Sequence, residues 1–335
     1  MNATLRPTKI GRRAPVQVQG KGSLLPRLRE AAINFVSDPA SARPLAWLRI
    51  GLATVLLLQA VAIAKSLLDL YANLGVIQWS LGDFQVSPGV PRISWLVKAL
   101  APWGVSDSAC VEAVFLLYVV SLAGLLLGWH TRVAAWFAWF THLALNTTGT
   151  AGTYGVDMFA NIALFYCIWM PVGHYASLDV LAKRVRGTPT ATARLALRVL
   201  QIHLCVIYFA SGLEKATGGQ WWNGEAIWRA VTEPEFRQFD FFWLASVPWV
   251  AKLASWGTLL VEIGYAFLVW PRRTRKLWAV STIGMHLGIA LFMGLLSFAG
   301  LMIVLTGAAF LASPEPRAQE SAADTLAPAP GGAAA

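Results

Sequence analysis

The sequence predicts an all-α protein, a polytopic integral membrane helix bundle with about eight spans. Hydrophobic residues make up 56% of the 335 residues and charged residues only 13%, a balance that soluble domains do not have. The apolar residues are gathered into long runs near the roughly 20 residues that a spanning helix needs. The backbone of such a run satisfies its own hydrogen bonds in lipid only as a helix or a closed barrel, and no alternating strand pattern is present.

The first element is a basic N-terminal segment, residues 1–43, which we expect in the cytoplasm. It has no apolar core of the kind found in a cleavable signal peptide, so the first span is predicted to act as its own insertion signal. Its basic residues are Arg6, Lys9, Arg12, Arg13, Lys21, Arg27, Arg29 and Arg43.

A transmembrane domain covering residues 44–313 follows. Its third and last apolar stretches are the shortest. The eight stretches lie at 44–66, 107–128, 132–147, 155–171, 190–214, 249–270, 274–293 and 296–313. Residues 314–335, rich in Ala and Pro, are predicted to form a disordered cytoplasmic tail.

The connections between the stretches differ in charge, and this predicts the topology. Three of them are rich in basic residues, at Arg132, at Lys183 to Arg186, and in "PRRTRK" at 271–276, and the others are poor in Lys and Arg. By the positive-inside rule these connections and both termini are cytoplasmic, in a multi-pass protein of the inner (plasma) membrane. The net charge of +10 is thereby explained by the basic residues of the cytoplasmic segments. No nucleic-acid partner is predicted.

The two long connections on the opposite side are predicted to carry short interfacial helices on the outer face. "ISWLVKALAPWG" is amphipathic, with Trp95 and Trp103 as interfacial anchors. "NGEAIWRAV" begins with Asn223, a residue type that caps helices well.

Cysteine and histidine spacing predicts neither disulfides nor a metal site. Cys110, Cys167 and Cys205 fall inside apolar stretches at unrelated spacings, which is typical of packing residues. No His-x-x-x-His pair is present, so we expect no metal.

Ionisable side chains inside spans are costly and are therefore the candidate functional residues. Asp157 and Lys215 are expected at the same outer level, where they could meet. Tyr208 and Ser211 share a helical stripe with Lys215, seven and four residues before it. The candidates are Arg49, His142, Asp157, His203, Lys215, Glu262 and His286.

Glu262 and His286 lie on consecutive spans and come within about 6 Å of each other in depth, at ~1.5 Å per residue. They are predicted to pair. Each candidate also has a structural alternative. Lys215 would snorkel to water, Asp157 would cap its helix, and Glu262 with His286 would form a strut between helices.

Five motifs follow one another along the chain, in the order "LAWLRIGL", "GVDMFANIALFYCIWMPVGHYASLD", "QIHLCVIYFASGLEKATGGQWWNGEA", "LLVEIGYAFLVW" and "IGMHLGIALFMG". Their order resembles the horizontally transferred transmembrane (HTTM) domain, the membrane core of vitamin K-dependent gamma-carboxylase. The similarity covers most of residues 44–312.

The resemblance implies a role for Lys215, because "GLEK" matches the carboxylase segment whose lysine deprotonates vitamin K hydroquinone. It also implies a quinol cofactor, oxygen and carbon dioxide as reactants, and chemistry on the outer side of the membrane. A base lysine needs an apolar, water-poor pocket, which Trp221 and Trp222 would roof as the cofactor-binding residues.

Two functions therefore stand as hypotheses. The first is a carboxylase-like membrane enzyme acting on a quinol or other apolar substrate, with Lys215 as base, Asp157, Tyr208 and Ser211 beside it, and Glu262, His286 and His203 as support or proton relay. The second is a non-catalytic membrane scaffold or lipid-binding protein. The expected partners are membrane lipid or quinone and an unidentified membrane or exported protein.

Overall fold

A computed structural model describes residues 24–76, 78–80, 87, 89–149 and 153–312. The described residues are helical apart from connections and one isolated antiparallel bridge between Ala40 and Thr190. The prediction for the tail at 314–335, and most of that for the N-terminal segment, concern residues outside this range.

The structure consists of long helices joined by short helices and turns. The long helices are α2 (Arg43–Ile63), α6 (Asp107–Leu127), α7 (Thr131–Thr148), α8 (Gly155–Trp169), α10 (Ala191–Thr217), α13 (Pro248–Leu268), α14 (Arg272–Met293) and α15 (Leu296–Thr306). The remaining elements are α1 (Leu24–Ser37), η1 (Ala64–Ser66), α3 (Leu67–Tyr71), α5 (Ile93–Leu100), η2 (Ala101–Trp103), α9 (Leu178–Leu181), α11 (Gly219–Asn223), α12 (Glu225–Thr232), η4 (Phe242–Ser246) and η5 (Gly307–Leu311).

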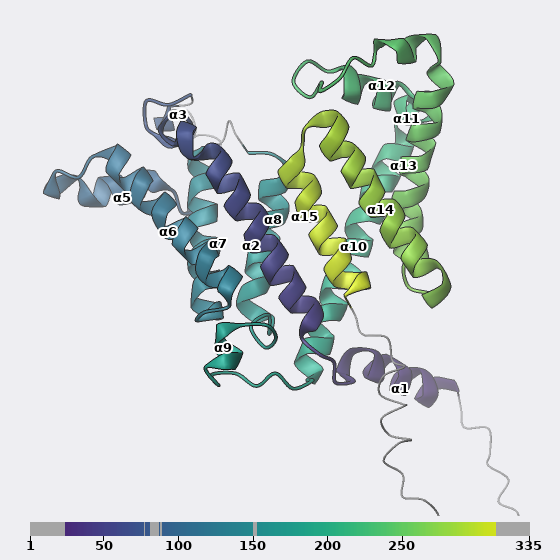
Figure 1. The fold of residues 1–335 in the computed structure, drawn as a ribbon, viewed down its shortest axis with the longest axis horizontal. Helices are drawn as coiled ribbons and strands as arrows, with labels where there is room; N and C mark the ends of the chain where they lie inside the picture. Colours follow the sequence, from purple (N-terminus) through teal and green to yellow (C-terminus); the bar gives the residue numbers. More distant parts are fainter. Residues whose placement is uncertain (1–23, 77, 81–86, 88, 150–152, 313–335) are drawn as a thin grey trace, which may run out of the picture.

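Each apolar stretch of the sequence forms one of the long helices, and these run side by side as a bundle (Figure 1). Within the described residues, four candidate spans are long and apolar enough to cross a membrane, at Arg43–Tyr71, Asp107–Leu127, Ala191–Thr217 and Arg272–Met293. The all-α class is thus confirmed, and the chain has the helices of a membrane protein. The count of eight spans remains a prediction.

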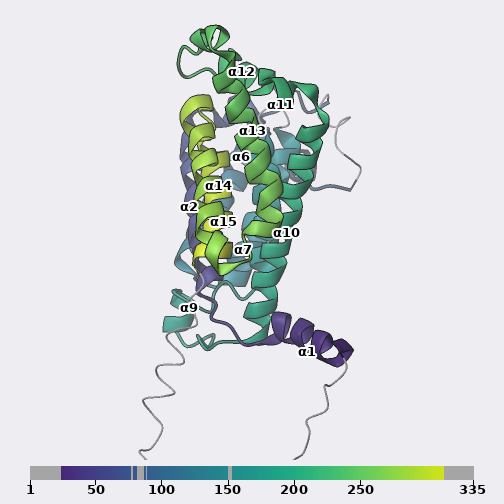
Figure 2. The same cartoon turned by 90° about the vertical axis from the view of Figure 1, so that its right-hand side faces the viewer.

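The bundle has two different ends, seen in Figures 1 and 2. One, here called the basic end, carries α1, α9 and the turn between α13 and α14. The other, the roof end, carries α3, α5, α11 and α12. The short helices expected in the two long connections are therefore present. The N-cap of α12 is Gly224 rather than Asn223, although Asn223 Oδ1 still accepts a hydrogen bond from Glu225 N at 2.9 Å.

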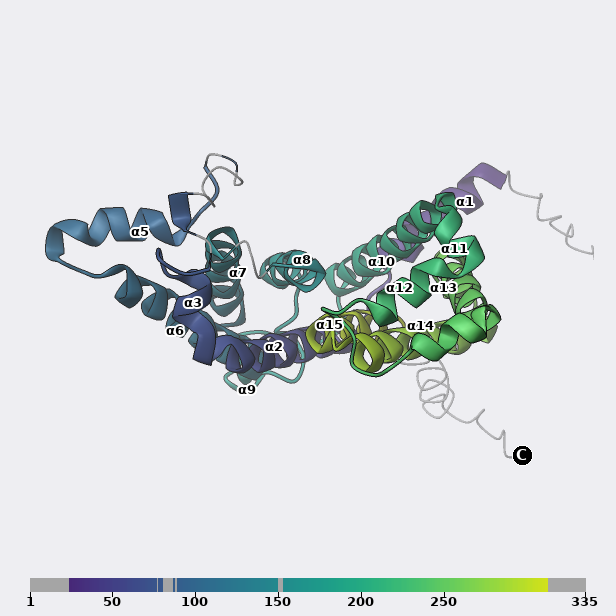
Figure 3. The same ribbon diagram turned by 90° about the horizontal axis from the view of Figure 1, so that it is seen from above.

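Viewed along the bundle, α6 and α7 lie on one side and α10, α13 and α14 on the other (Figure 3). Helices α2 and α15 pack against each other between them, and α8 contacts both. The candidate site lies in the half that contains α10, α13, α14 and α15.

Arg49 fixes the first half of the bundle at the basic end. Its side chain is fully buried in α2, and its guanidinium donates to four backbone carbonyls. The acceptors are Leu125 O at 2.7 Å, Leu126 O at 2.8 Å, Val172 O at 3.2 Å and Ala176 O at 2.5 Å. Leu125 and Leu126 end α6, whose last carbonyls have no partner within the helix, so one side chain joins α2, α6 and the loop after α8.

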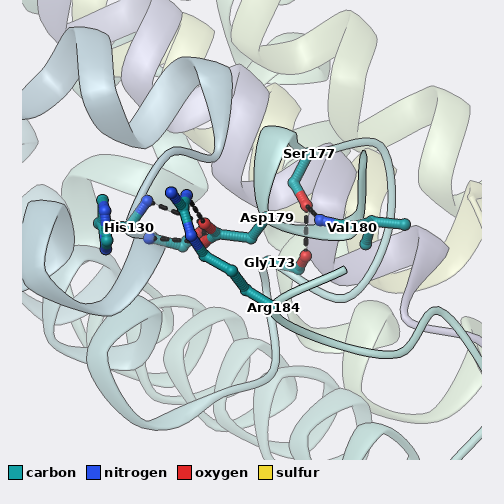
Figure 4. A network of polar contacts seen from close by, with 7 residues as sticks. His130, Gly173, Ser177, Asp179, Val180 and Arg184 are labelled. Atoms are coloured by element: carbon teal, nitrogen blue, oxygen red, sulfur yellow. Dashed lines mark hydrogen bonds and ion pairs between the residues drawn. The ribbon is translucent and has the colours of Figure 1, made fainter. Parts of the chain in front are cut away.

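Asp179 of α9 holds the beginning of α7 beside this point (Figure 4). Its carboxylate accepts hydrogen bonds from His130 N at 3.0 Å, Thr131 N at 2.8 Å and Thr131 Oγ1 at 2.7 Å, and it pairs with Arg184 at 3.2 Å. Burial acts to raise the pKa of Asp179, but the hydrogen bonds from Thr131, Arg184 and His130 outweigh it and lower that pKa below its ordinary value.

Replacing Asp179 by Ala is expected to lower the free energy of unfolding by about 2–4 kcal/mol, because buried donors at the start of α7 lose their acceptor. Asp38→Ala, at an exposed aspartate, is the control. A group with a lowered folded-state pKa stabilises the fold above its unfolded pKa, here about 3.9. The difference in melting temperature between wild type and Asp179→Ala should therefore shrink as the pH falls below about 4. A difference that stays constant with pH would contradict this assignment.

Candidate functional site

The candidate site lies where α10 and α13 come closest. Gly212 permits this approach: a Cβ added there would lie 2.7 Å from Ile263 Cγ1 and 3.1 Å from Glu262 Cβ. A larger residue at this position would push the helices apart, so the glycine brings the polar side chains of the two helices within contact distance.

Lys215 forms a buried ion pair at this point. Its Nζ lies 2.9 Å from Glu262 Oε2 and 2.5 Å from Ser211 Oγ, and it lies 5.5 Å from the centre of the Trp221 ring. The side chains of Lys215 and Glu262 are 25% and 8% exposed. Glu262 is therefore the carboxylate in direct contact with Lys215.

Asp157 is not the partner of Lys215. It is buried between α8 and α2, where Oδ1 accepts from Gln59 Nε2 at 3.2 Å and Oδ2 accepts from Tyr154 N at 3.0 Å. The second contact satisfies a donor at the start of α8, so the structural alternative of helix capping describes Asp157.

Tyr208 and His286 form a second polar pair close to the first. Tyr208 Oη lies 2.8 Å from His286 Nε2. The predicted direct pairing of Glu262 with His286 is wrong, because each contacts another residue of α10. His286 Nδ1 is buried and has no hydrogen-bond partner among the described residues.

Both pairs line one cavity of about 600 Å³. Its remaining wall is almost entirely apolar and aromatic, with residues from α8, α12, α14 and α15 closing it. The apolar lining residues include Phe159, Ile207, Trp221, Ile227, Val231, Met285, Ile289, Phe292, Phe298 and Met302. A molecule that fits there needs an apolar body and few polar atoms.

Trp222 and His203 lie outside this cavity. Trp222 is half exposed, and its Nε1 donates to Ala216 O at 2.8 Å. His203 Nδ1 lies 2.6 Å from Tyr166 Oη, which is the packing role expected of an isolated histidine. In the described residues no group of three or more His, Cys, Asp or Glu side chains is placed to hold a metal ion.

Glu262 was not predicted as the partner of Lys215, because the prediction placed the ends of neighbouring helices at one level. At about 1.5 Å per residue, Lys215 lies roughly 3 Å from the end of α10 at Thr217, whereas Glu262 lies roughly 21 Å from the start of α13 at Pro248. The start of α13 therefore extends past α10, and α11 packs on that extension.

The chain is similar to known proteins over most of its length. The HTTM domain model matches residues 92–312, about two thirds of the chain. The uncharacterized protein YitO of Bacillus subtilis (strain 168) is 25% identical over 194 residues, covering 55% of this chain and 62% of YitO. The chain thus matches less than two thirds of that relative. No solved structure matches it.

Breaking the ion pair from one side is expected to destabilise the protein more than removing both partners. Lys215→Met leaves the buried Glu262 carboxylate without its cationic partner, which should lower the unfolding free energy by about 3 kcal/mol, while the double variant Lys215→Met/Glu262→Met should recover most of the loss. Melting temperatures in detergent measure the loss in the single variant and the recovery in the double variant.

The exposed pair of Arg229 and Glu225, at 2.6 Å, is the matched control. Arg229→Met is expected to cost less than about 1 kcal/mol. Equal losses for Arg229→Met and Lys215→Met would show that burial of the Lys215 pair has no energetic consequence.

Proposed function

This chain belongs to the HTTM domain family, and we propose that it binds a lipid-soluble, hydroxyl-bearing molecule of the quinol class in the cavity between α10, α13, α14 and α15. We further propose that the Lys215–Glu262 pair takes up a proton from that hydroxyl. In its most specific form, the proposal is that the protein is a carboxylase-like enzyme that oxidises a quinol.

The observation that carries the proposal is the concentration of polar groups in an otherwise apolar cavity. Lys215, Ser211 and Glu262 are grouped at one part of the wall, and Tyr208 with His286 at another. A flat ring with oxygen substituents matches this lining, since aromatic side chains such as Phe159, Phe292 and Phe298 offer surfaces for ring packing.

A bound quinol would supply a hydroxyl proton and would be the reductant, and oxygen, the reactant that the family resemblance implies, would be the oxidant that accepts its electrons. Ser211 Oγ and Lys215 Nζ are the groups able to hydrogen-bond a hydroxyl placed beside them. Lys215 acts as base by releasing one proton to the Glu262 carboxylate while accepting the hydroxyl proton, so that the net transfer is one proton to Glu262. The apolar wall excludes water that would otherwise compete for these groups.

We also propose that the roof end faces outward from the inner (plasma) membrane. Support comes from the charge distribution. Lys183 and Arg184 follow α9, and Arg273 is in the first turn of α14, so these residues belong to elements at the basic end (Figure 1). Lys215 is in the last turn of α10, just before α11 of the roof end. The site would then lie on the exported side.

A non-catalytic lipid-binding function is the second candidate. The observation in its favour is the ion pair itself, because Lys215 already has Glu262 and Ser211 as partners within the protein. In that case the cavity holds a lipid and the pair only joins α10 to α13.

Filling the cavity is expected to abolish binding. Gly288 lines it, and a Cβ added there meets only Phe292, at 3.9 Å, so Leu at this position extends into open space. Gly284, on the same helix, also has open space around it but does not line the cavity. Binding of a naphthohydroquinone, measured by fluorescence quenching, should fall at least about tenfold in Gly288→Leu, since a leucine occupies the space of several ring atoms. Gly284→Leu should bind normally, and equal binding by both variants would exclude this cavity.

Removing the amine tests chemistry separately from binding. Lys215→Ala is expected to reduce turnover of the copurified quinol or lipid, identified by mass spectrometry, by about 10²-fold or more while still binding it, because proton transfer in the active site contributes factors of that size. Lys252→Ala is the control, since Lys252 also lies over a tryptophan, Trp256, at 5.0 Å but not in the cavity. Unchanged turnover in Lys215→Ala would contradict the role of Lys215 as a base and would favour the non-catalytic lipid-binding function.

A further inference from the structure

A second cavity, of about 280 Å³, lies at the basic end, away from Lys215. It is enclosed by the start of α7, the end of α8, and α9 with the loop after it. Four basic residues line it, and Figure 4 shows two of them, His130 and Arg184, around Asp179. The basic lining residues are His130, Arg132, His174 and Arg184.

The charge balance of this second cavity is positive. Asp179 is the one acidic residue among its described lining residues, and its carboxylate is already occupied by His130 N, the Thr131 hydroxyl and N–H, and Arg184. Arg132 is exposed and has no hydrogen bond or ion pair with any other described residue. A guanidinium in this position is suited to an anion with several oxygens, above all a phosphate group.

Exposed aromatic residues place the cavity at the level of lipid headgroups. Trp129, Trp169 and Tyr175 are 53%, 67% and 41% exposed, and each is adjacent in sequence to a lining residue of the cavity. Tryptophan and tyrosine in such positions are typical of the interface between membrane and water.

Exposed leucines on α9 also support a position of the cavity at the level of the lipid headgroups. Leu178 and Leu181 are exposed on this short helix, beside a cavity that basic residues line. Apolar side chains exposed next to a basic cavity suit a molecule that has a charged headgroup and an acyl chain.

We propose that this cavity binds the phosphate group of an anionic phospholipid. Arg132 and Arg184 contact the phosphate oxygens, His130 and His174 contact the phosphate or the glycerol, and the acyl chains lie against the exposed side of α9. The site is independent of the Lys215 cavity and of the function proposed for it. The same phosphate chemistry is available from a soluble phosphate ester, and the experiment separates the two sources.

The test measures binding of phosphatidylglycerol to the detergent-purified full chain by native mass spectrometry. Arg132→Gln is expected to weaken binding about fivefold, the factor expected for one basic residue near an anionic lipid surface. Arg186→Gln removes the same charge from the loop after α9 at a residue that does not line the cavity, and it should bind normally. Melting temperatures of both variants, expected to equal that of wild type, show that a loss is not caused by unfolding.

Two further ligands serve as controls in the binding experiment. Phosphatidylcholine, which has the phosphate but no net charge, should bind more weakly than phosphatidylglycerol, and Arg132→Gln should weaken its binding by a smaller factor. Inorganic phosphate at millimolar concentration should not displace the lipid. Equal losses in Arg132→Gln and Arg186→Gln, or none in either, would overturn the site. Displacement by inorganic phosphate would overturn the membrane lipid as its source.

Discussion

The arrangement at the basic end depends on one interaction, the contact of the Arg49 guanidinium with four backbone carbonyls. A fully buried cation is tolerated only if its donors are satisfied, and here they are satisfied by the end of α6 and by the loop after α8. Gly128 makes room for this contact, since a Cβ added there would lie 2.6 Å from Arg49 Nη1, and its φ of +68° suits glycine.

The positions of α9 and of the start of α7 depend on that contact. Gly128 O accepts a hydrogen bond from Asp179 N at 3.0 Å, and Asp179 in turn holds the first residues of α7. The walls of the basic cavity are therefore positioned by the same network that ends α6 and begins α7. In the Lys215 cavity the cation is also satisfied by partners within the protein, but its main partner is a carboxylate rather than backbone carbonyls. This pair joins α10 to α13.

Helices were predictable from sequence to within a few residues, because long apolar runs have few alternatives in lipid. The predicted stretch at 107–128 is α6 at Asp107–Leu127, and the one at 249–270 is α13 at Pro248–Leu268. Lys215, Ser211 and Tyr208 were found together because residues four and seven apart on one helix share a face whatever surrounds them. Glu262 and Asp157 were assigned the wrong partners, because partners on other helices depend on how far each helix extends.

The sequence by itself determined the all-α class, the positions of the long helices, the separation of basic and non-basic connections, and the stripe on α10 that carries Lys215. These properties are local or follow from composition. Only the tertiary structure decided that Lys215 meets Glu262, that Asp157 caps α8, and that two cavities form at opposite ends. The physical reason is that the offset between α10 and α13 is set by close packing at Gly212 and by the fold of the connection between them, neither of which is encoded in the periodicity of either helix.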